Sequence, residues 1–116
     1  MDLQKVFKPK NMAVVGVSLT NDRHPANVIF NKNRLRYPVD VFAVNPKGGS
    51  LYGEKVFCKV SDIPETIDLA VIAVKAEFVP GIIADCIKAG AKGAAVVSGG
   101  FAERDRQDLQ IGRAHV

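Results

Sequence analysis

Long apolar runs are missing from this 116-residue sequence: no stretch of about 18 apolar residues occurs, so no membrane-spanning helix is expected. The start, Met1–Lys5, lacks a basic segment leading into a long apolar one, which predicts no secretory signal. Basic and aromatic side chains are not clustered as they are on nucleic-acid-binding surfaces, and the formal net charge is a modest +4. We therefore expect neither a membrane nor a nucleic acid as partner.

Cysteine is also scarce. Cys58 and Cys86 lie far apart and fit no metal-ligand spacing, so we expect no metal site. Two cysteines of this kind are typical of reduced thiols in a cytoplasmic protein. Both are expected to be packing residues, Cys86 because it falls on an apolar helix stripe.

Four short apolar runs, rich in valine, are the strongest signal that is present. They predict strands at 12–17, 39–44, 69–74 and 94–97. Runs of this length between helix-like segments are typical of strands buried on both faces of a parallel sheet. The length allows at most one domain, and a hydrophobic fraction of 47% is enough for its core. The sequence therefore predicts a single α/β domain.

Two helices are expected between these strands. The first opens at Pro25 and ends before Pro38. The second covers 78–89, with Pro80 in its first turn and Gly90 as its C-terminal cap. Residues 51–57 fit no single pattern, and 61–65 predict a short helical turn. The second helix is expected to bury one apolar stripe, made of Phe78, Ile82 and Cys86 with Ile83 and Ile87 beside it.

The segment after the first predicted strand is a candidate anion site. Gly16 stands where a side chain would obstruct the backbone, and Ser18 and Thr20 offer hydroxyl groups. In parallel sheets, ligands collect beyond the carboxyl ends of the strands. A plain strand-to-helix turn would use the same residue types, so this loop alone leaves both interpretations open. Three amides at the start of the following helix are expected to point outward and attract an anion, those of Ala26, Asn27 and Val28.

A nicotinamide dinucleotide site would require Gly-x-Gly-x-x-Gly in this loop and an acidic residue at the end of the second strand. The sequence instead has Ser18 and Asn21 at the second and third glycine positions. Its second strand ends in Asn45-Pro46-Lys47, where a lysine replaces the expected carboxylate. This pattern argues against NAD and favours a ligand with an extra phosphate near its ribose. An NADP-binding oxidoreductase domain remains an alternative.

Five segments carry a more specific signal when taken together. They are VVGVS at 14–18, AVNPKGG at 43–49, DLAVIAV at 68–74, FVP at 78–80 and SGGFAE at 98–103. In this order and spacing they resemble the N-terminal CoA-binding domain of the ADP-forming acyl-CoA synthetases, the acetate–CoA ligase type. That group is related to the alpha subunit of succinyl-CoA synthetase and to bacterial protein lysine acetyltransferases. The resemblance covers residues 3–109 and implies a Rossmann-like, doubly wound parallel sheet in three layers, truncated at its C-terminal end.

The resemblance also implies which residues contact CoA. The Gly-x-Ser loop at 16–18 would hold its phosphates, and the turn at 45–47 would lie along its adenosine, with Lys47 pairing the 3′-phosphate. Residues 74–76 would border the nucleotide, and 98–101 would approach the pantetheine arm. With the Asn27 amide, the candidate CoA-binding residues are Gly16, Val17, Ser18, Asn27, Asn45, Pro46, Lys47, Val74, Lys75, Ala76, Ser98, Gly99, Gly100 and Phe101.

Two residues of this chain, one of them among these candidates, depart from the family pattern. Many relatives have glycine where this chain has Ala26, and proline where it has Lys75. No catalytic residue is expected. His24, beside Pro25, is interpreted as a surface residue, and Asp68 is expected to end a turn rather than act as a base.

In a complete family member, acid, CoA and ATP interconvert with acyl-CoA, ADP and phosphate. The resemblance places the phosphohistidine and the ATP-grasp module, with ATP, ADP and Mg²⁺, in further domains or a partner subunit. This chain is therefore expected to bind CoA or acyl-CoA and to catalyse nothing alone. Alternatives are the CoA-binding domain of a protein lysine acetyltransferase, or a stand-alone CoA-binding protein.

The last six residues, Ile111–Val116, are suspect. They are the translation of ATC GGA AGA GCA CAC GTC, the start of a widely used sequencing adapter. We expect residues 1–110 to belong to the CoA-binding domain, which is incomplete, and residues 111–116 to be a non-native tail.

Overall fold

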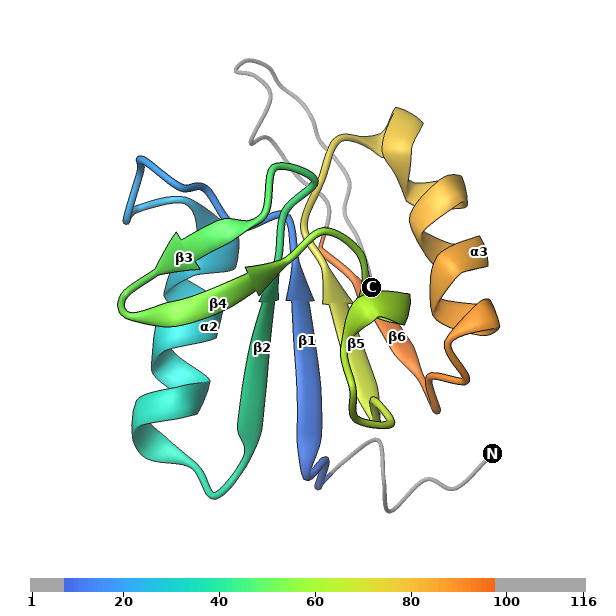
Figure 1. Cartoon of the computed structure of the whole chain (residues 1–116), viewed down its shortest axis with the longest axis horizontal. Coiled ribbons are helices and arrows are strands. Elements are labelled where there is room, and N and C mark those ends of the chain that lie inside the picture. Colours follow the sequence, from blue (N-terminus) through green and yellow to red (C-terminus); the bar gives the residue numbers. More distant parts are fainter. Residues whose placement is uncertain (1–7, 98–116) are drawn as a thin grey trace.

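The computed structural model describes residues 8–97, and within them six strands form one sheet in the order β3-β4-β2-β1-β5-β6 (Figure 1). The strands are β1 (Asn11–Val15), β2 (Asp40–Val44), β3 (Gly49–Leu51), β4 (Glu54–Phe57), β5 (Leu69–Ile72) and β6 (Ala94–Val96). All neighbouring pairs are parallel except β3 and β4. The four predicted strands are confirmed, with slightly different ends, and so is the α/β class.

Helices cover both faces of this sheet. Successive residues of β1 point to opposite faces, so Val14 packs in the cluster beneath α2 (Pro25–Arg36) and Ala13 and Val15 in the cluster beneath α3 (Val79–Lys88). From β1 the chain passes to β2 on one side and later returns to β5 on the other. This three-layer, doubly wound arrangement confirms the Rossmann-like prediction and places a topological switch point at β1.

The segment without a clear sequence pattern is a hairpin. Residues 49–57 form β3 and β4, and Tyr52 and Gly53 make the two-residue connection with φ of 54° and 80°. β4 then pairs in parallel with the end of β2. The short helical turn predicted at 61–65 is a 3₁₀ turn, η1 (Val60–Asp62).

The predicted ends of the second helix are close to the observed ones. α3 follows a 3₁₀ turn, η2 (Ala76–Phe78), and has Pro80 in its first turn. At its other end Gly90 has a φ of 78°, its N–H donates to the Ile87 carbonyl, and the Ala91 N–H donates to that of Cys86. These two bonds are the Schellman cap that Gly90 predicted.

The predicted stripe on α3 is wrong at two positions. Phe78 is 54% exposed and Ile87 is 74% exposed, whereas Ile82, Ile83 and Cys86 do pack on the core. Phe78 belongs to η2, so α-helical spacing does not apply to it, and Val79 takes its place against the sheet. Ile87 lies about 100° around the helix from Cys86 and faces outward.

The two cysteines differ from each other. Both are free thiols, as expected, and Cys86 is buried. Cys58 is exposed, so the prediction that it packs in the core is wrong. It follows β4 directly, at the end of the sheet where the chain leaves the core.

Candidate carboxyl-edge binding site

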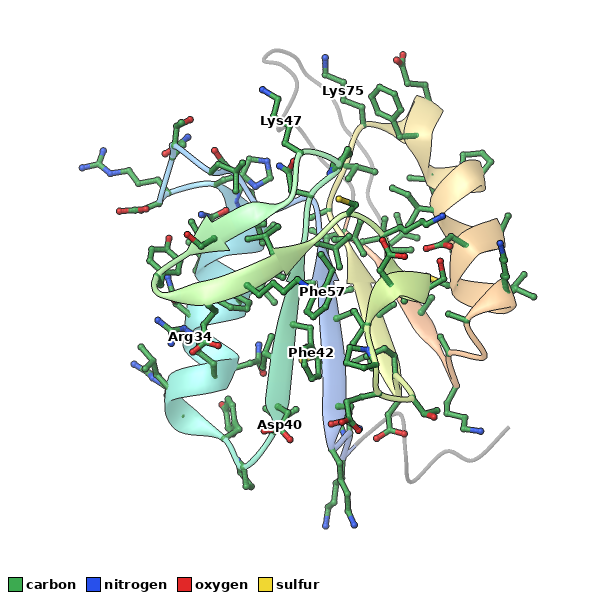
Figure 2. The ribbon with its side chains drawn as sticks, in the orientation of Figure 1. Arg34, Asp40, Phe42, Lys47, Phe57 and Lys75 are labelled. Atoms are coloured by element: carbon green, nitrogen blue, oxygen red, sulfur yellow. The ribbon has the colours of Figure 1, made fainter. Side chains whose placement is uncertain are left out.

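The predicted site residues come together at one edge of the sheet. The strands β1, β2 and β5 point their carboxyl ends to the same edge (Figure 1). The loops that follow them contain 16–18, 45–47 and 74–76. Lys47 and Lys75 extend from this edge (Figure 2). The candidate residues at 98–101 lie outside the described residues.

Gly16 is required where it stands, as the sequence predicted. Its φ is 107°, and its N–H donates to the Val44 carbonyl at 3.0 Å. A Cβ at this position would lie 2.3 Å from the Ala73 carbonyl oxygen and 2.8 Å from Cγ1 of Val74. The absence of a side chain therefore lets the loops after β1 and β5 approach each other.

Asn27 holds the loop after β1 through its side chain. This side chain is fully buried, and its Oδ1 accepts from the Ser18 N–H at 2.7 Å. Its Nδ2 donates to the Ser18 carbonyl at 2.8 Å and to the Tyr52 hydroxyl at 3.1 Å. The Asn27 side chain is thus bonded inside the protein, and the whole residue is buried, so Asn27 acts on the site by holding Ser18.

The Ser18 hydroxyl group accepts two hydrogen bonds from its own loop. Its Oγ accepts from the N–H groups of Thr20 at 3.2 Å and Asn21 at 2.9 Å. A hydroxyl has two acceptor sites and one proton. With both acceptor sites occupied by the loop, the proton of Ser18 is the group that can be donated to a ligand oxygen.

Asn45 joins the second loop to the first. Its Nδ2 donates to the Val17 carbonyl at 2.8 Å, and its Oδ1 accepts from the Lys47 N–H at 2.8 Å. The Gly48 N–H donates to the Asn45 carbonyl at 2.8 Å, which closes a turn with Pro46 and Lys47 at its centre. The turn fixes the Lys47 backbone and leaves its exposed side chain at the edge.

The third loop supplies a second lysine. Lys75 and Ala76 are exposed, and Val74 is half-buried against the core beneath α3. The Lys75 carbonyl accepts from the Phe78 N–H at 2.9 Å, which starts η2. Two lysine side chains from separate loops therefore lie at the edge where Ser18 can donate its proton, and this combination suits an anionic ligand.

The N-terminus of α2 does not present its amides to a ligand as the sequence predicted. Of the three amides expected to point outward, the Ala26 N–H donates to His24 Nδ1 at 3.1 Å and the Val28 N–H to the His24 carbonyl at 3.1 Å. Burial lowers the pKa of His24 below its usual 6.5, which favours the neutral ring that can accept this bond. His24 is thus a helix cap, and two of the three amides are used inside the chain.

Asp68 lies at the opposite edge and closes a turn, as predicted. Its buried carboxylate accepts from the N–H groups of Lys10 at 2.9 Å and Asn11 at 3.3 Å. No group of three His, Cys, Asp or Glu side chains within residues 8–97 is arranged to hold a metal ion. In the same part of the chain, no helix is long and apolar enough to cross a membrane.

Two hollows lie away from the carboxyl edge. One, of about 440 Å³, runs beside the first half of β2, where Arg34, Asp40, Phe42 and Phe57 contribute to its lining (Figure 2). The other, of about 980 Å³, lies at the amino ends of β1 and β5. Both are separate from the loops that carry the predicted site.

Sequence reasoning missed Tyr52 as a residue near the site. Its hydroxyl donates to Asp22 Oδ1 at 2.9 Å and accepts from Asn27, so it contacts the loop after β1 from the tip of the hairpin. The hairpin had no turn signal such as Asn-Gly, and the bond spans 30 residues. No local pattern in the sequence would have revealed it.

Comparison with known proteins gives the family. A model of the CoA binding domain matches residues 10–115. ADP-forming acetate–CoA ligase II of Archaeoglobus fulgidus is 36% identical over 98% of this chain and 18% of its own length. The alpha subunit of ADP-forming acetate–CoA ligase I of Pyrococcus furiosus is 35% identical over 96% of this chain and 25% of its own length.

A solved structure of a similar synthetase also matches this chain. The acetyl-coenzyme A synthetase 1 of Ca. Korarchaeum cryptofilum, described as dinucleotide forming and in complex with phosphate and ADP, has a TM-score of 0.78 and 39% identity. The match covers 86% of this chain and 22% of that protein. The chain thus spans about a quarter or less of these relatives. It belongs to the CoA-binding domain family, and its relatives include ADP-forming acetate–CoA ligases.

Proposed function

We propose that this domain binds CoA or acyl-CoA at the carboxyl edge of β1, β2 and β5. The observation that supports the proposal is the meeting of three loops there, with the Ser18 hydroxyl proton and the ammonium groups of Lys47 and Lys75 available to an anion. CoA carries a diphosphate and a 3′-phosphate, so it offers several acceptors to such an edge.

Each loop has an assigned part of the ligand in this proposal. The turn at 16–18 contacts the diphosphate, and the turn at 45–47 contacts the adenosine, with the Lys47 ammonium against the 3′-phosphate. The loop at 74–76 borders the nucleotide, and residues 98–101 approach the pantetheine arm. Gly16 and Asn45 act by shape and by hydrogen bonds within the protein, because they hold the loops in register.

The assignment of Lys47 can be tested by calorimetry with CoA and with dephospho-CoA. Lys47→Ala should weaken CoA binding about tenfold, since a charge-assisted hydrogen bond is lost, and should leave dephospho-CoA binding unchanged. Lys88→Ala, which removes an exposed lysine from the far end of α3, is the matched control and should change neither affinity. Equal affinity of the unmodified protein for the two ligands would refute the role of Lys47, and tight binding of NADP would favour the oxidoreductase alternative.

We further propose that the domain serves an ADP-forming acyl-CoA synthetase, in which acid, CoA and ATP give acyl-CoA, ADP and phosphate. The support is the similarity to ADP-forming acetate–CoA ligases over almost the whole chain. The ATP-binding and phosphoryl-transfer steps are assigned to other domains or to a partner subunit, and this chain holds CoA. The complete gene distinguishes the candidates, because an acetyltransferase module or an early stop would point to one of the two alternatives.

A further inference from the structure

Tyr52 has an unusual backbone conformation. Among residues 8–97 it is the single non-glycine residue with positive φ, at 54°. Two-residue hairpin turns of this kind normally contain Asn, Asp or Gly, because a large side chain is disfavoured in the left-handed region. A strained position of this type is retained when the surrounding contacts require it.

The side chain of Tyr52 shows what those contacts are. Its ring stacks on that of Phe30 at 6.2 Å with an interplanar angle of 21°, and the Arg34 guanidinium lies 5.5 Å from its centre. These contacts hold the ring against α2. Its hydroxyl is then placed between Asp22 Oδ1, to which it donates, and Asn27 Nδ2, from which it accepts.

Through Asn27 this hydroxyl is connected to Ser18. The Asn27 amide bonds to both the N–H and the carbonyl of Ser18, and it is fully buried. Loss of the Tyr52 hydroxyl would leave one Nδ2 hydrogen of the fully buried Asn27 side chain without its protein acceptor. The amide would then shift or rotate, and the Ser18 backbone would follow.

We propose that Tyr52 is a positioning residue that fixes the Ser18 turn for CoA, which couples the tip of the β3–β4 hairpin to the binding edge. This inference rests on the proposed CoA site. Tyr52 does not contact the ligand in this account. It holds Asn27 in the orientation in which the side chain bonds to both the N–H and the carbonyl of Ser18.

The test is Tyr52→Phe, which keeps the ring and removes only the hydroxyl. CoA binding measured by calorimetry should weaken about fivefold, the effect of one lost hydrogen bond passed on to the turn. Hydrogen exchange of the Ser18 amide, followed by NMR, should become faster in the variant. The matched tyrosine control is Tyr37→Phe, an exposed residue beyond the end of α2, which should change neither quantity.

A second control separates positioning from general stability. Val60→Ala removes buried volume beneath α3, on the other face of the sheet, and should lower Tm without weakening CoA binding. Tyr52→Phe that binds CoA as the unmodified protein does, or that leaves Ser18 exchange unchanged, overturns the inference. If the unmodified protein fails to bind CoA, the proposed function fails, and the exchange rate still decides whether Tyr52 holds the turn.

Discussion

The two edges of the sheet are closed by the same kind of bond but leave different groups exposed to a ligand. At the amino edge, the buried Asp68 carboxylate accepts two backbone N–H groups, and the Asn11 amide donates to the Thr66 carbonyl. These bonds pair the polar groups of the turn with one another, so they are not offered to a ligand. The nearby hollow has a mainly apolar lining that includes Met12 and Leu69.

At the carboxyl edge, the buried side-chain amide of Asn27 and the side-chain amide of Asn45 likewise bond to backbone groups of neighbouring loops. Those bonds hold the Ser18 and Lys47 backbone, and they use neither the Ser18 hydroxyl proton nor the ammonium group of the exposed Lys47 side chain. The comparison shows that a binding edge is recognised by the groups that remain after the internal hydrogen bonds have been counted.

Among substitutions at the two edges, we expect the largest loss of stability and of CoA binding at Gly16. Gly16→Ala places a Cβ 2.3 Å from the Ala73 carbonyl oxygen at a φ of 107°, so we expect a loss of about 2–5 kcal/mol in unfolding free energy and loss of CoA binding. Chemical denaturation measures the unfolding free energy, and calorimetry measures CoA binding. Gly81→Ala is the control, because its Cβ would meet open space in the first turn of α3, and stability should hold or rise. Equal effects of the two substitutions would contradict this account.

A substitution at the amino edge should lower stability without changing CoA affinity. Asp68→Ala leaves the Lys10 and Asn11 N–H groups without their acceptor and should cost about 1.5–3 kcal/mol of unfolding free energy. CoA affinity, measured well below Tm, should stay the same. Asp40→Ala removes an exposed carboxylate at the same edge and should change stability by no more than about 0.5 kcal/mol. A loss of CoA affinity in Asp68→Ala would show that the two edges are not independent.

The smallest effect is a pH dependence at the cap of α2. Because the pKa of His24 is lowered in the folded state, the unfolded state binds the proton more readily. The stabilising contribution is complete above pH 6.5 and is lost as pH falls from 6.5 through the lower folded pKa. His24→Asn keeps a capping side chain that does not titrate, so unfolding free energy should depend less on pH in this range. Identical pH profiles for the two proteins would exclude His24 as the source.

Much of the fold was predictable because its signals are local. Valine-rich runs mark buried strands, Pro80 and Gly90 mark the ends of α3, and a glycine directly after a strand marks a tight approach. At the site, the loops after β1, β2 and β5 could be predicted to meet because parallel strands end at one edge.

The remainder depends on contacts between distant residues. The hairpin at 49–57 lacks a turn signal because Tyr52 occupies a position that usually needs Asn or Gly, and its ring contacts with α2 compensate. The exposure of Phe78 depends on a 3₁₀ turn that breaks the helical spacing. The internal use of the Ala26 amide depends on the histidine two residues earlier, which the sequence alone suggested to be a surface residue.

The most direct test of CoA binding at the carboxyl edge is an NMR titration of the protein with CoA, in which backbone amide shifts are followed residue by residue. We expect the largest shifts to cluster at 16–18, 45–47 and 74–76, with little change at Asp68, Lys10 and Asn11. Shifts concentrated in the hollow at the amino ends of β1 and β5, or no saturable shifts at the three loops, would contradict it.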